Sequence, residues 1–106
     1  MDGFKNVSVV KKANVYFGGN VVSRTVRFED GSVKTLGFMQ AGEYTFNTAE
    51  AEVMEFMSGE LEVDLPDRRE PLVINGECTF EVPANSSFSL RVSKPADYCC
   101  SFVKNK

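Results

Sequence analysis

The chain contains no histidine and no tryptophan, and its net charge is only −3 over 106 residues. Neutral imidazole is the commonest protein ligand for transition metals, so the absence of histidine argues against a metal oxygenase, dioxygenase or metal isomerase. The small negative charge gives no long-range attraction to nucleic acid or to an anionic membrane. No apolar run approaches the roughly 20 residues that span a bilayer. We therefore expect neither nucleic acid nor a membrane as a partner.

Cysteine is scarce, and its three copies are poorly placed for a disulfide. Cys99 and Cys100 are adjacent in a strand-like segment, where neighbouring side chains point to opposite faces. Three free thiols fit a reducing cytoplasm, and residues 1–10 lack the apolar core of a secretory signal. The composition predicts a cytoplasmic protein. A metal or redox role for the cysteine pair stays open, although no CxxC spacing is present.

Apolar and polar residues alternate with a period of two over most of the chain, which predicts β-strands. Residues 21–28 and 33–39 show this alternation on both sides of a Glu-Asp-Gly-Ser turn, so we expect them to form a hairpin. The Asn75-Gly76 dipeptide predicts a second hairpin farther along the chain.

Further turn signals at residues 58–59 and 94–97 divide the chain into nine or ten short predicted strands. Residues 48–57 include helix formers but lie between strand patterns, and we interpret them as a loop followed by a strand. The pattern predicts an all-β, single-domain sandwich or barrel formed by residues 14–106. Residues 1–13 have the weakest pattern, and we expect an arm that could pair across a dimer interface.

Two spaced motifs resemble those of the cupin family of jelly-roll proteins. The first cupin motif reads His-x-His, three or four residues, Glu, six residues, Gly, and its last two positions match Glu52 and Gly59. The second motif runs from a Gly through Pro-x-Gly to a His, and Gly76 and Pro83 match its start and centre. The positions of the metal-ligating histidines are occupied by Phe46, Thr48 and Phe88. The resemblance implies a cupin-type jelly roll, and because one carboxylate cannot hold a transition metal alone we expect no metal site.

A longer stretch resembles the pyrimidine/purine nucleoside phosphorylases, a family of very small cupins. The most distinctive block is GEYTF-x-TAE at residues 42–50, and shorter matches are NVYFGG at 14–19, FEVP at 80–83 and YCC at 98–100. The resemblance covers about residues 14–103. It implies phosphorolysis of purine and pyrimidine nucleosides to the free base and α-D-ribose 1-phosphate. It also implies a cytoplasmic homodimer that uses phosphate as co-substrate and no organic cofactor.

Cleavage of an N-glycosidic bond builds positive charge on the ribose ring, and a nearby carboxylate would stabilise that charge. Glu52 is the candidate catalytic residue because the cupin motif points its side chain into the barrel; the alternative is a surface glutamate on a polar loop, and Glu50 is a weaker candidate. Aromatic and hydroxyl side chains could stack on the base or donate to ribose and phosphate, although each could equally be core or surface. The candidate substrate-binding residues are Tyr44, Phe46, Thr48, Ser87, Phe88 and Tyr98.

Phosphate needs hydrogen-bond donors, yet the segment between Lys34 and Arg68 contains no Lys or Arg and eight acidic residues. Arg24 and Arg91 occupy alternation positions that could face the barrel, so we expect them to bind phosphate. Other candidates are Arg27, Lys34 and a nest of backbone N–H groups. A buried Arg24 could instead be the structural partner of a carboxylate.

Two other function classes stay open. One is a non-enzymatic cupin that binds a small ligand or a protein partner, and the other is a metal-dependent cupin that uses Glu and Cys ligands. Release of free base in the presence of phosphate would separate the phosphorylase from the binding protein. Metal analysis of the purified protein would test the third class.

Overall fold

The computed structural model describes residues 3–103, and strands make up most of this part of the chain. Its nine strands are β1 (Ser8–Val9), β2 (Asn14–Tyr16), β3 (Val21–Arg27), β4 (Val33–Met39), β5 (Gly42–Asn47), β6 (Ala51–Asp64), β7 (Leu72–Asn75), β8 (Cys78–Val82) and β9 (Ser87–Val103). One 3₁₀ turn, η1 (Phe17–Gly19), lies between β2 and β3. The all-β prediction is confirmed. In the described range, no helix has the length and apolar character needed to cross a membrane.

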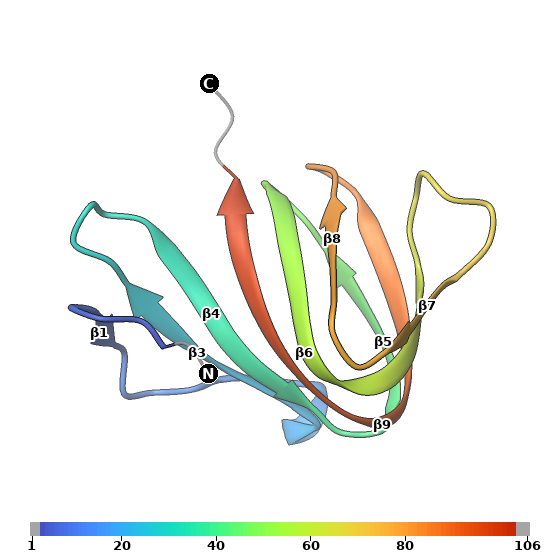
Figure 1. The fold of residues 1–106 in the computed structure, drawn as a ribbon, viewed down its shortest axis with the longest axis horizontal. Helices are drawn as coiled ribbons and strands as arrows, with labels where there is room; N and C mark the ends of the chain where they lie inside the picture. The colour runs from blue at the N-terminus through green and yellow to red at the C-terminus, as the bar shows by residue number, and fades with distance from the viewer. Residues whose placement is uncertain (1–2, 104–106) are drawn as a thin grey trace.

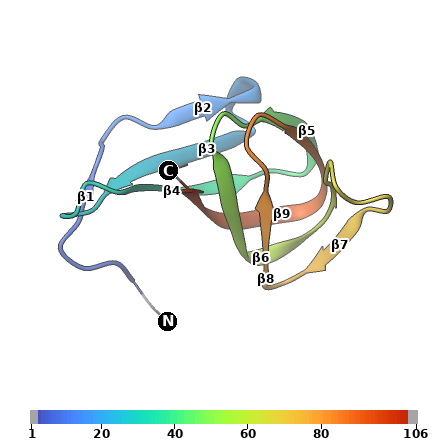
Figure 2. The same cartoon turned by 90° about the horizontal axis from the view of Figure 1, so that it is seen from above.

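Two long strands, β6 and β9, run side by side through the centre of the molecule (Figure 1). The second edge of β9 pairs with β4 near its end and with β5 near its start. The second edge of β6 pairs with β8 and then with β7. Strand β3 pairs with β4 on one edge and with β1 and β2 on the other. Figure 2 shows β3, β4, β9, β6 and β8 curving around one interior, which is the predicted jelly roll.

The predicted turns at residues 58–59 and 94–97 are wrong, because β6 and β9 continue through them. The pairing register between the two strands shifts at Ser58, and Pro95, which has no N–H to donate, is tolerated in this interruption. A Cβ on Gly59 would lie 2.7 Å from the Cβ of Ala96, so the strands approach closely where they bend. The turn-forming residues therefore mark bulges within long strands rather than strand ends.

The predicted hairpin at Asn75-Gly76 is also wrong. Strands β7 and β8 do not pair with each other; both pair with the same edge of β6. Gly76 has a φ of +91°, and its N–H donates to the carbonyl of Gly59 at 2.9 Å. The left-handed residue bends the chain beside the bulge of β6 instead of reversing it.

The predicted N-terminal arm packs against its own chain. In β1, Ser8 pairs with Arg27 and Val9 pairs with Val26 of β3. The ring of Phe4 packs edge-to-face against the ring of Phe28, just beyond β3, with the two ring centroids 5.0 Å apart. Contact of this arm with a partner subunit stays a prediction.

The interior of the roll has an apolar half and a polar half. Inward side chains from β5, β7, the second half of β6 and the first half of β9 fill the apolar half, including Leu61, Val63, Ile74, Leu90 and Val92. In the other half, which we call the polar half, apolar side chains such as Met39 and Met54 are joined by hydroxyl, thiol, phenol and carboxyl groups on β3, β4, β6 and β9. The polar half is where a functional site can form.

Candidate functional site

A cavity of about 180 Å³ lies in the polar half of the interior. Its aromatic and apolar lining consists of Tyr16, Met39, Phe46, Met54, Phe88 and Tyr98. Its polar lining consists of Ser23, Thr35, Asn47, Glu52 and Cys100. Four of the residues proposed from the sequence therefore meet in one cavity: Phe46, Glu52, Phe88 and Tyr98.

Glu52 lies near the start of β6, opposite Val82 of β8 and Phe102 of β9. The expectation that it lies in a loop is wrong, because β6 begins one residue earlier. Its side chain is half-buried, and loss of solvation raises the pKa of its carboxyl above the usual 4.5. A hydrogen bond with the Cys100 thiol opposes this rise in pKa, and the negative charge of Glu50 adds to it.

The phenol ring of Tyr98 forms part of the cavity floor, and Gly37 makes room for it. Gly37 faces Tyr98 across the β4–β9 ladder, and a Cβ at Gly37 would lie 2.5 Å from the phenol oxygen. The Ser23 hydroxyl, which accepts from the Asn14 amide at 3.2 Å, interacts with the phenol and lowers the pKa of Tyr98. Burial raises the pKa of Tyr98, so the phenol keeps its proton and can donate it in a hydrogen bond.

Aromatic rings form one wall of the cavity. Phe46 and Phe88 stack with ring centroids 5.9 Å apart and planes 27° apart. Tyr16 contacts Phe46 edge-on at 5.9 Å, and Phe17 does so at 5.3 Å. Phe17 has a φ of +53°, which is uncommon for a large side chain and is found at functional sites and tight turns. Aromatic side chains of this kind are a common stacking surface for planar rings.

Three of the proposed substrate-binding residues do not line this cavity. Tyr44 is buried, and its hydroxyl donates to the carbonyl of Gln40 at 2.7 Å. Thr48 is buried, and its hydroxyl donates to the carbonyl of Pro83 at 2.7 Å. Ser87 is exposed at the start of β9. The hydroxyls of Tyr44 and Thr48 fix chain segments around the site, and a role for the three residues in binding substrate stays a prediction.

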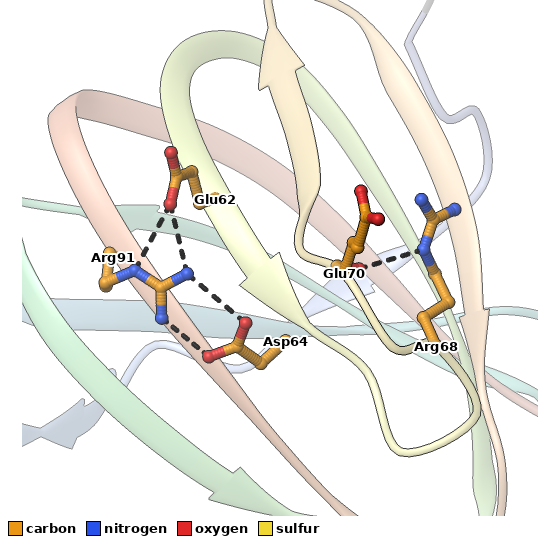
Figure 3. Close-up of polar contacts among 5 residues, drawn as sticks. All are labelled: Glu62, Asp64, Arg68, Glu70 and Arg91. Atoms are coloured by element: carbon orange, nitrogen blue, oxygen red, sulfur yellow. Dashed lines mark hydrogen bonds and ion pairs between the residues drawn. The ribbon is translucent and has the colours of Figure 1, made fainter.

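Arg91 lies on the outer surface rather than in the barrel. Its guanidinium donates to Asp64 at 2.6 and 3.2 Å and to Glu62 at 3.1 and 3.3 Å (Figure 3). These bonds lower the pKa of the Asp64 carboxyl and raise that of the Arg91 guanidinium. Figure 3 also shows a surface contact between the Arg68 guanidinium and the carbonyl of Glu70, at 3.4 Å.

Arg24 is exposed as well, because the inward residues at the start of β3 are Val21 and Ser23. The expectation that Arg24 faces the barrel is wrong, because its neighbour Ser23 does so. A shift of one position along a strand exchanges its inner and outer faces. Within residues 3–103, no lysine or arginine lines the cavity. Phosphate binding by Arg24 and Arg91 stays a prediction that this placement does not favour.

Sequence reasoning missed five lining residues with useful chemistry or position: Tyr16, Ser23, Thr35, Asn47 and Cys100. Tyr16 and Cys100 lie in the runs that resemble the phosphorylase family, which was a usable signal. Ser23 and Thr35 carried no clear signal, since their strands mix small polar, charged and apolar residues. Across the described range, no three His, Cys, Asp or Glu side chains gather in a way that could hold a metal ion.

Comparison with known proteins places this chain in one family. The family model described as pyrimidine/purine nucleoside phosphorylase matches residues 11–102. A protein of that name from Sulfurimonas denitrificans is 60% identical over 104 residues, covering 98% of this chain and 100% of the relative. A crystal structure of a protein of unknown function from Acinetobacter sp. ADP1 is 42% identical with a TM-score of 0.90, covering 95% and 98% of the two chains.

More distant likeness concerns the fold alone. The structure of an RmlC-like cupin from Shewanella frigidimarina has a TM-score of 0.69 at 16% identity, covering 86% of this chain and 81% of the other. The cupin-type architecture expected from the two spaced motifs is confirmed.

Proposed function

Since this chain belongs to the pyrimidine/purine nucleoside phosphorylase family, we propose that it catalyses phosphorolysis of purine and pyrimidine nucleosides. A phosphate oxygen forms a bond to C1′ of the ribose, and the C1′–N bond breaks with its electron pair going to the base. The base nitrogen takes the proton that the attacking phosphate gives up, so the products are the free base and α-D-ribose 1-phosphate. The observation that carries the proposal is a half-buried carboxylate beside an aromatic wall in one cavity.

Glu52 has the position and chemistry to stabilise the ribose as positive charge develops on it. In the described part of the chain it is the one carboxylate that lines the cavity. Burial strengthens its interaction with a cation, because low-dielectric surroundings screen charge less than water does. Its carboxylate oxygens can also accept hydrogen bonds from ribose hydroxyls.

The aromatic wall suits a broad range of bases. Phe46, Phe88 and Tyr16 present ring faces and edges to the cavity. Stacking depends little on the pattern of donors and acceptors on a base, so a purine and a pyrimidine can both use this wall.

Phosphate would be held here by neutral donors. The cavity offers the hydroxyls of Ser23 and Tyr16 and the amide of Asn47. Each of these groups can donate a hydrogen bond to a phosphate oxygen. We place the phosphate subsite among these side chains rather than at Arg24 or Arg91.

The direct test incubates the purified protein with single nucleosides, with and without inorganic phosphate, and separates the products by chromatography. We expect free base and ribose 1-phosphate from both purine and pyrimidine nucleosides, and no base without phosphate. Base released without phosphate would indicate hydrolysis. Binding of nucleosides without turnover would favour the alternative, a non-enzymatic cupin that binds a small ligand.

We also expect the activity to need no metal or organic cofactor. The assay is therefore repeated after treatment with EDTA, and turnover should be unchanged. Turnover that disappears with the chelator and returns with a single metal would overturn this expectation.

The proposal extends to a cytoplasmic homodimer. All three cysteines are free thiols, as a reducing compartment favours. The outer face of β4 exposes Leu36 and Phe38, and such apolar side chains would be covered in an isologous dimer. Light scattering at micromolar concentration should give twice the mass of one chain, and a single-chain mass would contradict the dimer.

A further inference from the structure

Three adjacent strands align a hydroxyl, a thiol and the carboxyl group of Glu52 on the cavity floor. Thr35 of β4 lies directly opposite Cys100 of β9, and Cys100 lies opposite Met54 of β6. Glu52 is two residues before Met54 and so shares its inward face. The side chains of Cys100, Thr35 and Glu52 all line the cavity, and interactions of the Cys100 thiol with the Thr35 hydroxyl and the Glu52 carboxyl contribute to the pKa values of Cys100 and Glu52.

The direction of these two bonds follows from the chemistry of the groups. A carboxylate can only accept, so the Cys100 S–H donates to Glu52. Burial and the nearby negative charge raise the pKa of the Cys100 thiol, which keeps its proton in place. The contact with Thr35 lowers the pKa of the Cys100 thiol, as expected when the Thr35 hydroxyl donates to sulfur. The chain of bonds therefore runs from hydroxyl to sulfur to carboxylate.

We propose that Cys100 is a positioning residue whose S–H group holds the Glu52 carboxylate in one orientation and in its charged form. The proposal rests on the proposed function, because it assigns Cys100 a role through Glu52. Two opposing influences act on Glu52: solvent loss together with the negative charge of Glu50 favours the neutral acid, and the thiol bond favours the anion. The other titratable groups at the cavity are the phenols of Tyr98 on β9 and Tyr16 on β2, and burial keeps the Tyr98 phenol protonated. With no cation among the lining residues described, the thiol is the group that favours the charged form.

Cys99 provides a matched control because it is the adjacent residue of the same strand. Its side chain points to the other face of β9 and does not line the cavity, yet it is also buried and also a free thiol. Substitutions at Cys99 and Cys100 therefore remove the same chemical group from the same strand, and only one of them touches Glu52.

The test compares Cys100→Val, Cys100→Ser and Cys99→Val. Valine has a similar size but no donor, so for Cys100→Val we expect kcat to fall about tenfold, the lower end of the usual effect of losing a hydrogen bond to a charged group, because S–H is a weak donor. The acid limb of the kcat/KM profile should move to higher pH. Cys100→Ser keeps a donor and should recover most of the activity, and Cys99→Val should behave like the wild-type protein.

A second measurement does not depend on turnover. The pKa of Glu52 is followed by carbon-13 NMR of its carboxyl group in the wild type and in the two valine variants. We expect a higher pKa in Cys100→Val and no change in Cys99→Val. Circular dichroism confirms the fold of each variant; if Cys100→Val does not fold, Thr35→Val and Cys100→Ser take its place, with a smaller expected pKa change.

The two proposals can fail separately. An unchanged pKa of Glu52 in a folded Cys100→Val protein overturns the positioning role, whatever the enzymatic activity is. A wild-type protein without phosphate-dependent base release overturns the proposed function, while the NMR titration still decides whether the thiol keeps Glu52 ionised.

Discussion

The two ends of β6 carry carboxylates in opposite surroundings. Near the start, Glu52 points inward, is half-buried, and has a thiol as its hydrogen-bond donor. At the end, Asp64 points outward and is paired with the Arg91 guanidinium. The pKa of the first carboxyl is raised and that of the second is lowered.

The difference favours one of the two carboxylates for the proposed function. The surface pair gains a cationic partner but is screened by water and salt, so it contributes little to stability. The inward carboxylate has no cation beside it in the described structure and loses solvation, which is unfavourable for folding. Groups held in such unfavourable surroundings occur most often at functional sites. The comparison therefore favours Glu52 over Asp64 for the proposed catalytic role, and it leaves Asp64 with surface pairing.

The largest effect expected is on turnover. Glu52→Gln keeps the shape of the side chain but removes its negative charge, so kcat should fall by about 10²–10³. Purine and pyrimidine nucleosides should be affected alike, because the charge acts on the ribose common to both. Steady-state kinetics with one nucleoside of each class measures this. Asp64→Asn is the control at the other end of β6 and should stay within about twofold of the wild type.

Turnover of Glu52→Gln close to that of the wild type would remove Glu52 from the catalytic residues. A loss confined to purines or to pyrimidines would instead place Glu52 beside the base.

The next effect concerns the floor of the cavity. Gly37→Ala would bring a Cβ to 2.5 Å from the Tyr98 phenol oxygen, so the ring must move. Overpacking of this kind usually costs about 1–3 kcal/mol of unfolding free energy. The displaced phenol should also lower activity, since Tyr98 lines the cavity. Urea unfolding and kinetics of the folded variant measure the two effects.

Tyr98→Ala supplies the control for this substitution. In a protein that already lacks the ring, Gly37→Ala should be much less destabilising than in the wild type. An equal loss of unfolding free energy in the wild type and in Tyr98→Ala would mean that Gly37 does not act through Tyr98.

A smaller effect, with opposite signs at the two ends of β6, is expected on stability. The pKa of Glu52 is higher in the folded than in the unfolded state, so stability falls as pH rises from the unfolded pKa through the folded one. At neutral pH, Glu52→Gln should therefore raise Tm. The folded pKa of Asp64 is lowered, so its stabilisation is present above the unfolded pKa and is lost as pH falls through the folded pKa. Asp64→Asn should slightly lower Tm at neutral pH.

Thermal unfolding from about pH 3 to pH 8 tests both signs, because this range includes the unfolded pKa values of Asp and Glu. The Tm differences of both variants from the wild type should become smaller toward the acid end of this pH range. A Tm change of the same sign for the two variants at neutral pH would contradict the comparison.

The sequence predicts the kind of fold because strand alternation is a local property. It could not show that β6 and β9 are continuous, because Gly59 and Pro95 are turn formers whose role as bulge residues depends on the partner strand. The same holds for Asn75-Gly76, where the local geometry is right but the paired strand is β6. Local turn chemistry fixes backbone angles, and only the tertiary structure decides whether the chain reverses or bends.

The site is predicted in part for a related reason. Motif spacing placed Glu52, Phe46 and Phe88 together because the cupin motifs describe inward positions of the barrel. Motif spacing could not show which face of β3 points inward. A shift of one residue decides whether Arg24 or Ser23 faces the interior, and Ser23 does. The partners of Glu52 come from strands far apart in the chain, so their contacts arise only when the sheet assembles.

The smallest effect is expected for the arginines. Arg91→Ala and Arg24→Ala remove exposed cations outside the cavity, and the carboxylates that Arg91 pairs with are themselves on the surface. The KM for phosphate should therefore stay within about twofold of the wild type, and Tm should fall slightly for Arg91→Ala alone. Asn47→Ala is the contrasting variant, because its amide lines the cavity and is a proposed phosphate donor. It should raise the KM for phosphate more than either arginine variant does. If instead an arginine variant raises that KM about tenfold or more, as loss of a charged phosphate contact would, the anion enters from the outer face and the neutral subsite is wrong.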